Sequence, residues 1–179
     1  MRRLLAATAA LFLTPITAMA ISMSELTSNP EQYNKIVEER DHIIYIDTNT
    51  IESLRYSPPY YTMRCNFYIA SYSGNNIYES TITIDYDYNR SMITLMRKIL
   101  DEDQRNGISD TKEQLFKKLE IELTKDEGMR VSLTNVKRWD LDGNLTGELS
   151  PAYGITHVYG KSFWAIGSCL FKLYYNEPF

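Results

Sequence analysis

Few residues of this sequence have the types and spacing that a catalytic, metal-binding or cofactor-binding site requires. The two histidines, His42 and His157, stand in neither the His-x-x-x-His nor the Cys-x-x-His spacing that zinc sites commonly use. The sequence also lacks the Gly-x-Ser-x-Gly elbow, a phosphate-binding glycine loop and the dinucleotide fingerprint. We therefore predict a protein that is not an enzyme, with no catalytic residue, no metal ligand and no cofactor.

Two carboxylate patterns could suggest a catalytic pair or a calcium site, but each has a simpler structural explanation. Asp85 and Asp87 alternate along the chain, as the solvent-facing residues of any antiparallel strand do. In residues 140–144 the glycine, Gly143, is fourth, whereas a calcium-binding EF-hand loop needs its glycine in the sixth position. We expect a solvent face in the first case and a tight turn in the second.

The chain has two cysteines, Cys65 and Cys169. An even pair in an oxidising compartment favours a disulfide, and two buried free thiols are the alternative. A catalytic role is disfavoured, because neither cysteine has a nearby histidine or a Cys-x-x-Cys partner.

Residues 1–20 have the pattern of a cleavable secretory signal peptide. Arg2 and Arg3 precede an apolar run over residues 4–13, and Ala18-Met19-Ala20 supplies the small-x-small cleavage site. The run is too short for a transmembrane helix, which needs about 20 residues. We therefore expect export to the periplasm, the cell surface or the medium, with no integral membrane span after cleavage.

Composition narrows the classes of partner. The formal net charge is −4, and no cluster of Lys and Arg is interleaved with aromatic residues, so we expect no binding to nucleic acid. The 14 tyrosines suit half-buried strands, and a protein-binding face is the alternative interpretation.

The middle of the chain has the alternation of antiparallel strands. Two short strands are predicted over residues 33–39 and 43–47, before a stiff loop at Ser57-Pro58-Pro59. Residues 61–69 and 78–88 alternate with period two and predict a hairpin.

Helical spacing follows the hairpin. Ser91 or Asn89 can cap a helix with one apolar stripe, and Asp110 with Glu113 predicts the capping box of a second amphipathic helix that ends at Lys125. Beyond Gly128, a strand with an irregularity before Trp139 is expected. The aromatic, apolar segment 163–175 predicts a core strand with Gly167 at a bend.

These elements predict an α+β fold: an antiparallel β-sheet with two amphipathic helices packed on it, preceded by the signal peptide. One domain is expected over residues 33–179, after a polar N-terminal segment at residues 21–32. In that segment Asn29-Pro30-Glu31 favours the start of a helix.

Two short motifs resemble the surface-adhesin protein E family. In Ile-Ile-Tyr45-Ile-Asp47-Thr-Asn-Thr-Ile51, a strand ends in Tyr-x-Asp and leads into a turn with a hydroxyl residue and isoleucine, as in that family. The second motif resembles the family's Tyr-Asp with an arginine at a strand end; its residues are Tyr86, Asp87 and Arg90. The resemblance covers roughly residues 33–103.

The motif residues have structural roles that physical chemistry explains. Asp47 is expected to cap its turn through hydrogen bonds from its side chain to the backbone, and Arg90 to pair with Asp85 or Asp87 at the edge of the sheet. Such residues preserve a fold, so the resemblance predicts the fold more directly than the function.

The family's namesake is a bacterial surface protein that binds host extracellular-matrix and plasma proteins. The resemblance therefore implies an adhesin-like protein of the bacterial envelope with a protein partner, and a host matrix protein by analogy. Tyr56, Tyr60 and Tyr61, beside two prolines, form our hypothetical contact surface. Two alternatives remain: a periplasmic structural or assembly factor, and a secreted enzyme or enzyme inhibitor with an unrecognised site. No feature of the sequence fixes the oligomeric state.

Overall fold

The computed structural model describes residues 21–149, 153–155 and 161–179, so the predicted signal peptide lies outside the described residues. The described strands are β1 (Tyr33–Glu38), β2 (His42–Asp47), β3 (Glu52–Ser57), β4 (Tyr60–Ser71), β5 (Asn76–Asp87), β6 (Met129–Asp140), β7 (Leu145–Leu149) and β8 (Tyr153–Ile155). The described helices are α1 (Met23–Ser28), α2 (Met92–Arg105), α3 (Lys112–Lys125) and α4 (Lys161–Tyr175), with short 3₁₀ turns η1 (Thr48–Thr50) and η2 (Tyr88–Arg90). The α+β class is confirmed.

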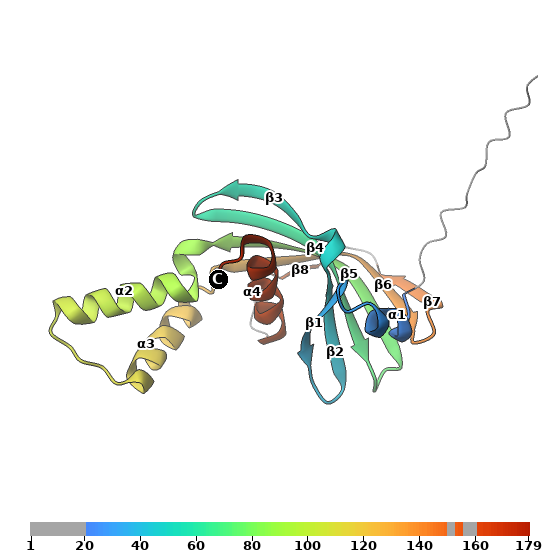
Figure 1. Ribbon diagram of the computed structural model, residues 1–179, viewed down its shortest axis with the longest axis horizontal. Coiled ribbons are helices and arrows are strands. Elements are labelled where there is room, and N and C mark those ends of the chain that lie inside the picture. The colour runs from blue at the N-terminus through green and yellow to red at the C-terminus, as the bar shows by residue number, and fades with distance from the viewer. Residues whose placement is uncertain (1–20, 150–152, 156–160) are drawn as a thin grey trace, which may run out of the picture.

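All described strands join one antiparallel sheet (Figure 1). Its main order is β1-β2-β4-β5-β6-β7, and in addition β3 pairs with β4 and β8 pairs with β6. The predicted β4–β5 hairpin is confirmed, and its ladder runs without a break from Tyr60 opposite Asp87 to Ser71 opposite Asn76. β2 pairs with the second half of β4 and β3 with the first half, so these two strands follow one another along a single edge. The prolines before Tyr60 form the tight turn between β3 and β4.

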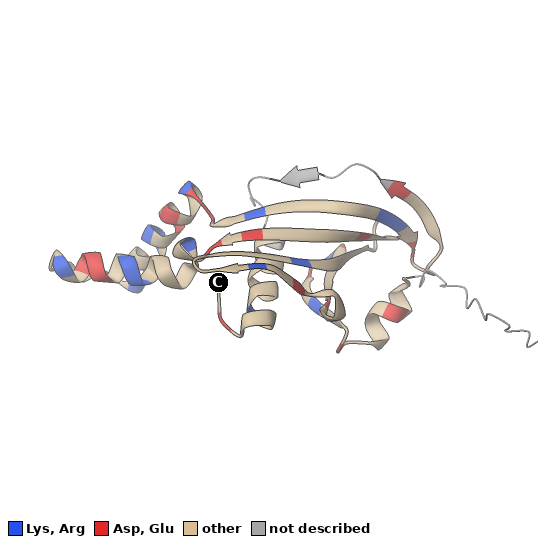
Figure 2. Ribbon diagram, turned by 90° about the horizontal axis from the view of Figure 1, so that it is seen from above, with Lys and Arg blue, Asp and Glu red and all other residues tan. Residues whose placement is uncertain are grey.

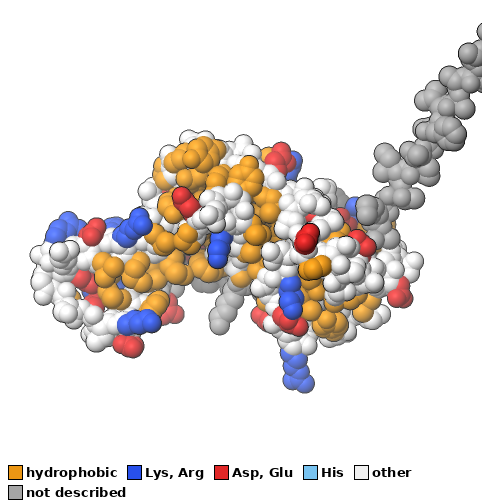
Figure 3. All heavy atoms as spheres, in the orientation of Figure 1, with side chains coloured by type: hydrophobic (Ala, Val, Ile, Leu, Met, Phe, Trp, Pro, Cys, Tyr) orange, Lys and Arg blue, Asp and Glu red, His pale blue; other side chains and the backbone are white. Residues whose placement is uncertain are grey.

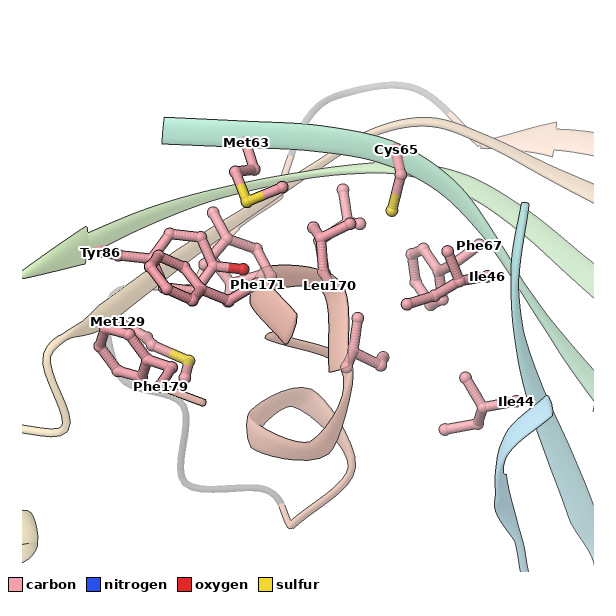
Figure 4. Packing of buried hydrophobic residues seen from close by; sticks show 14 residues of the cluster. Ile44, Ile46, Met63, Cys65, Phe67, Tyr86, Met129, Leu170, Phe171 and Phe179 are labelled. Atoms are coloured by element: carbon pink, nitrogen blue, oxygen red, sulfur yellow. The ribbon is translucent and has the colours of Figure 1, made fainter. Parts of the chain in front are cut away.

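The main core lies between the sheet and α4. Alternate residues of β4, among them Met63, Cys65 and Phe67, point toward the helix, whose Leu170 and Phe171 point back at the sheet (Figure 4). This alternation is the period of two that the sequence shows, with one face of the sheet buried.

The prediction for residues 163–175 was wrong, because this segment is the helix α4 and not a strand. A run that is apolar on nearly every side suits a fully buried strand and a buried helix equally well. At Gly167 the helix α4 lies close against the sheet, because a Cβ there would lie 2.6 Å from Met129 Sδ.

The opposite face of the sheet is covered at one end by the N-terminal segment. Ile21 and Leu26 are buried against residues of β1, β2, β4, β5 and β6, including Trp139. The helix of this segment, α1, begins at the cap Ser22 and ends before Pro30. The predicted helix start at Asn29-Pro30-Glu31 was therefore wrong, and the proline follows the helix instead.

α2 and α3 form a helical hairpin between β5 and β6 that extends beyond the end of the sheet (Figures 1 and 2). The two helices pack on each other through Leu95, Ile99 and Leu119, and charged residues recur along both of them (Figure 2). Ser91 caps α2 as predicted. The capping box of α3 is Thr111 with Gln114, one residue beyond the predicted Asp110 and Glu113.

Candidate protein-binding surface

Aromatic side chains from β3, β4, η2 and α4 meet where the β3–β4 hairpin faces the C-terminal end of α4. The Tyr56 and Tyr61 rings stand edge to face with centroids 5.5 Å apart, and Tyr175 of α4 lies 5.8 Å from the first ring and 5.2 Å from the second. Tyr174 packs on Tyr175 at 4.9 Å, and Tyr88 lies 6.1 Å from Tyr61. We call these five tyrosines the aromatic surface.

The aromatic surface has an exposed part and a supported part. Tyr56 is 69% exposed and Tyr174 49% exposed, whereas the other three side chains are only partly accessible. Figure 3 shows hydrophobic side chains gathered over the β3–β4 hairpin and continuing toward α4. Two of the rings are therefore accessible to a partner, and the other three hold them in position.

The supported part rests on the core. Phe171 lies 5.2 Å from Tyr61 and stacks on Tyr88, and the buried Phe179 packs against both Phe171 and Tyr88. A hydrogen bond of 2.8 Å joins the Tyr175 hydroxyl to Ser53 of β3. These contacts fix the rings before any partner arrives, which lowers the entropy cost of binding.

The structure brings together two of the three tyrosines of the hypothetical contact surface and separates the third. Tyr56 pairs directly with Tyr61 across the β3–β4 ladder, so both point to the face that carries α4. Tyr60 precedes Tyr61 and therefore points to the opposite face, where the Arg55 guanidinium lies 5.5 Å from the centre of its ring. Tyr60 is 46% exposed, but on the other side of the hairpin.

The first motif of the sequence builds a capped turn. The buried Asp47 carboxylate accepts hydrogen bonds from the Asn49 backbone N–H at 3.1 Å and from the Gln32 amide at 3.3 Å. Tyr45 is buried on the face covered by α1, and Ile51 packs against the main core. These residues hold β1, β2 and the turn together and present no reactive group to solvent.

The second motif is structural as well, but Arg90 acts differently from the prediction. Asp87 caps η2 by accepting the Asn89 N–H at 3.0 Å, and the Tyr86 hydroxyl donates to the Gly167 carbonyl at 2.9 Å. The predicted pairing of Arg90 with Asp85 or Asp87 was wrong, since its guanidinium donates to the carbonyl oxygens of Glu122 and Asp126. Carbonyls at a helix C-terminus lack partners within the helix, and a nearby arginine is a natural donor for them.

Cys65 and Cys169 are free thiols in this structure, so the expected disulfide is not formed and the alternative of two free thiols holds. Cys65 is buried on β4, and Cys169 is partly accessible on α4. Burial raises the pKa of the Cys65 thiol to about 12 and also raises the pKa of Cys169. Both sulfurs therefore stay protonated near neutral pH, which does not suit a nucleophile.

The other candidate polar groups stand apart from the aromatic surface. Asp85 accepts a hydrogen bond from Thr62 on the exposed face of the sheet, and Asp140 accepts backbone N–H groups that close its own turn. Ligand atoms of Glu39, Asp41 and His42 lie within 4.8 Å of one another at the β1–β2 turn, where both carboxylates are exposed. Exposed acidic groups are common without an ion, and His157 lies outside the described residues.

No family model, no curated protein and no solved structure matches this chain. The resemblance to the surface-adhesin protein E family therefore stays a prediction. None of the helices in the described part of the chain has the length and hydropathy that crossing a bilayer takes.

Sequence reasoning missed three members of the aromatic surface, Tyr88, Tyr174 and Tyr175, and it placed the last two in a strand. A signal for them exists, since Phe171 and Tyr175 are four residues apart and therefore lie on one face of a helix. In the structure the Phe171 and Tyr175 rings are in contact, with centroids 4.8 Å apart. Strand β3, which carries Tyr56, was also not predicted.

Proposed function

We propose that this chain is an exported, non-enzymatic protein of the bacterial envelope or cell surface that binds another protein through the aromatic surface. The observation that carries the proposal is the combination of exposed Tyr56 and Tyr174 with a rigid aromatic support beneath them. Export is supported by the signal-peptide pattern of residues 1–20, and the adhesin-like role by the resemblance of residues 33–103.

Tyrosines suit this role for physical reasons. A tyrosine ring offers a large contact area with only two rotatable side-chain bonds, so it loses little entropy when a partner binds. Its hydroxyl can hydrogen-bond at the wet rim of an interface. Aromatic residues supported by neighbours are also the usual hot spots of protein interfaces, where a few side chains carry most of the binding energy.

Site-specific photocrosslinking in cells tests the proposal. A photoreactive phenylalanine analogue replaces Tyr56 in one version of the full chain and Tyr60 in another, so that two exposed tyrosines on opposite faces are compared. We expect one discrete protein adduct from position 56 and none at that mass from position 60. Equal adducts from both positions, or none from position 56, contradict the proposed surface.

Protease treatment of intact source cells separates the adhesin-like role from the alternative of a periplasmic structural or assembly factor. Digestion of the protein while a periplasmic control survives supports exposure on the cell surface. Survival of both proteins supports the periplasmic role, and recovery of uncleaved chain in the cytoplasm contradicts export altogether.

A further inference from the structure

Strand β3 is a free edge of the sheet beside the aromatic surface. It pairs with β4 on one side, and Figure 1 shows it as the outermost strand there. Five of its six residues are exposed, and among the described residues no backbone hydrogen bond outside the regular elements involves residues 52–57. The backbone groups on its outer side are therefore left to water, and such an edge is a template for another strand.

The hydrogen-bond pattern of β4 shows which groups of β3 point outward. Tyr88 donates its backbone N–H to the Pro59 carbonyl, so every second residue of β4 counted from there bonds to β5, and the residues between them face β3. Ser57 and Arg55 are the ladder partners of two residues that face β3. Tyr56 lies between Ser57 and Arg55, and it therefore directs its own N–H and C=O toward the free edge.

The side chain of Tyr56 joins this edge to the aromatic surface. Its ring is 69% exposed on the α4 face, where Tyr175 lies 5.8 Å away and Tyr174 packs on Tyr175. Directly opposite residues of a ladder project to the same face, so a residue of an added strand opposite Tyr56 would project toward these rings. Strand addition of this kind combines main-chain hydrogen bonds with contacts of alternate side chains.

The other face of the edge has an arginine without an acidic partner. Arg55 is exposed, and its guanidinium lies 5.5 Å from the centre of the Tyr60 ring but forms no ion pair with a described residue. The nearest acid along β3, Glu52, is already paired with Arg64 at 2.7 Å. An acidic side chain on an added strand would therefore be complementary to this position and would favour one register.

We propose that the partner of the aromatic surface presents an extended segment that pairs with the free edge of β3 as an added strand. An apolar side chain of that segment lies beside Tyr56, and an acidic side chain lies beside Arg55. The irregularity between Ser53 and Arg55 limits the regular edge to residues 55–57, so the main-chain contacts set the register and the tyrosines supply most of the contact area. This inference rests on the proposed function, because it concerns the same surface.

Photocrosslinking from both faces of β3 tests the proposal. A photoreactive phenylalanine analogue replaces Tyr56 in one version of the full chain, Ser57 in a second and Tyr60 in a third. Ser57 and Tyr60 both point away from α4, but an added strand would lie about 5 Å from β3, which carries Ser57, and about 10 Å from β4, which carries Tyr60. We expect adducts with the same partner from positions 56 and 57 and none from position 60.

The other outcomes separate this inference from the proposed function. An adduct from position 56 alone overturns the added strand and leaves the proposed function in place, because the partner then sits on the α4 face only. Adducts from all three positions, or none from position 56, contradict both.

Charge reversal tests the acidic contact. Arg55→Glu should weaken binding of the partner captured from position 56 at least about tenfold, because two like charges would then face each other. Arg130→Glu is the matched control, since Arg130 is an exposed arginine opposite Asp85 on β6, and it should leave the affinity unchanged. Both variants should melt like the wild type. Unchanged affinity in Arg55→Glu, or an equal loss in both variants, overturns the acidic contact.

Discussion

At the scale of single residues, Arg90 joins three parts of the molecule. It belongs to η2 at the end of β5, and its guanidinium reaches the last turn of α3 and the segment that leads into β6. It also forms an ion pair with Glu122, and most of its side chain is shielded from solvent. A residue that satisfies several carbonyls at once fixes the base of the hairpin relative to the sheet.

We predict that Arg90→Ala lowers the free energy of unfolding by about 1–2 kcal/mol, because the carbonyl groups of Glu122 and Asp126 lose a charged donor. Arg64→Ala is the matched control, since Arg64 forms an exposed ion pair with Glu52 and should cost no more than about 1 kcal/mol. Urea unfolding of the three proteins gives the comparison. Equal losses from the two substitutions contradict the role assigned to Arg90.

Cys65 makes stability fall in alkaline solution. In the folded protein burial holds its pKa at about 12, against an ordinary value of 9.0. Between these values the unfolded chain binds fewer protons than the folded one, so the free energy of unfolding falls as the pH rises. The expected loss from this group is about 1.4 kcal/mol between pH 8 and 10.

Urea unfolding at pH 8, 9 and 10 checks this prediction with Cys65→Ala beside the wild type. The variant should start from a lower stability, because it leaves a cavity, and should lose less with rising pH. Burial also raises the pKa of Tyr68 and Tyr86. These two tyrosines therefore lower the free energy of unfolding at alkaline pH in the wild type and in the variant alike. Parallel pH profiles for wild type and variant rule out the assigned effect of Cys65.

At the scale of elements, the packing of α4 on the sheet orders the aromatic surface. Tyr86 of β5 donates to the Gly167 carbonyl, and the absence of a side chain at Gly167 lets the helix approach Met129 and Ile84 closely. Tyr174 and Tyr175 lie at the end of this helix. The position of α4 therefore sets how Tyr175 meets Tyr56, and Tyr174 packs on Tyr175.

We predict that Gly167→Ala destabilises the protein by about 1–3 kcal/mol, although alanine favours helix, because the new Cβ would lie 2.6 Å from a buried sulfur. Met129→Ala should recover part of this loss in the double variant, since it removes the atom in contact. A double-mutant cycle by thermal unfolding measures the coupling. Strictly additive effects, or a stabilised single variant, contradict the close approach.

The elements also show how far the sequence could be interpreted. The β4–β5 hairpin and the cap of α2 were predictable, because strict alternation and a serine before an apolar stripe are local signals. The identity of α4 was not, because a segment apolar all round has no period to distinguish a helix from a strand. The aromatic surface depended on that assignment, so only Tyr56 and Tyr61 of its five members were foreseen in the contact surface.

At the scale of the whole molecule, the sheet separates two buried faces. α4 covers one face and the N-terminal segment covers part of the other, and the α2–α3 hairpin projects beyond both (Figure 1). The aromatic surface lies on the α4 face, and the hairpin helices α2 and α3 contribute no residue to it. Substitutions on the outer sides of the hairpin should therefore leave the aromatic surface intact.

The affinity of the partner captured from position 56 tests the central claim most directly. The dissociation constant is measured for the wild type, Tyr56→Ser and Tyr60→Ser, together with each melting temperature. We predict that Tyr56→Ser weakens binding at least about tenfold, as loss of a hot-spot aromatic does, while Tyr60→Ser leaves it unchanged and both variants melt like the wild type. Equal affinities of all three proteins, or a loss with Tyr60→Ser alone, would contradict the account.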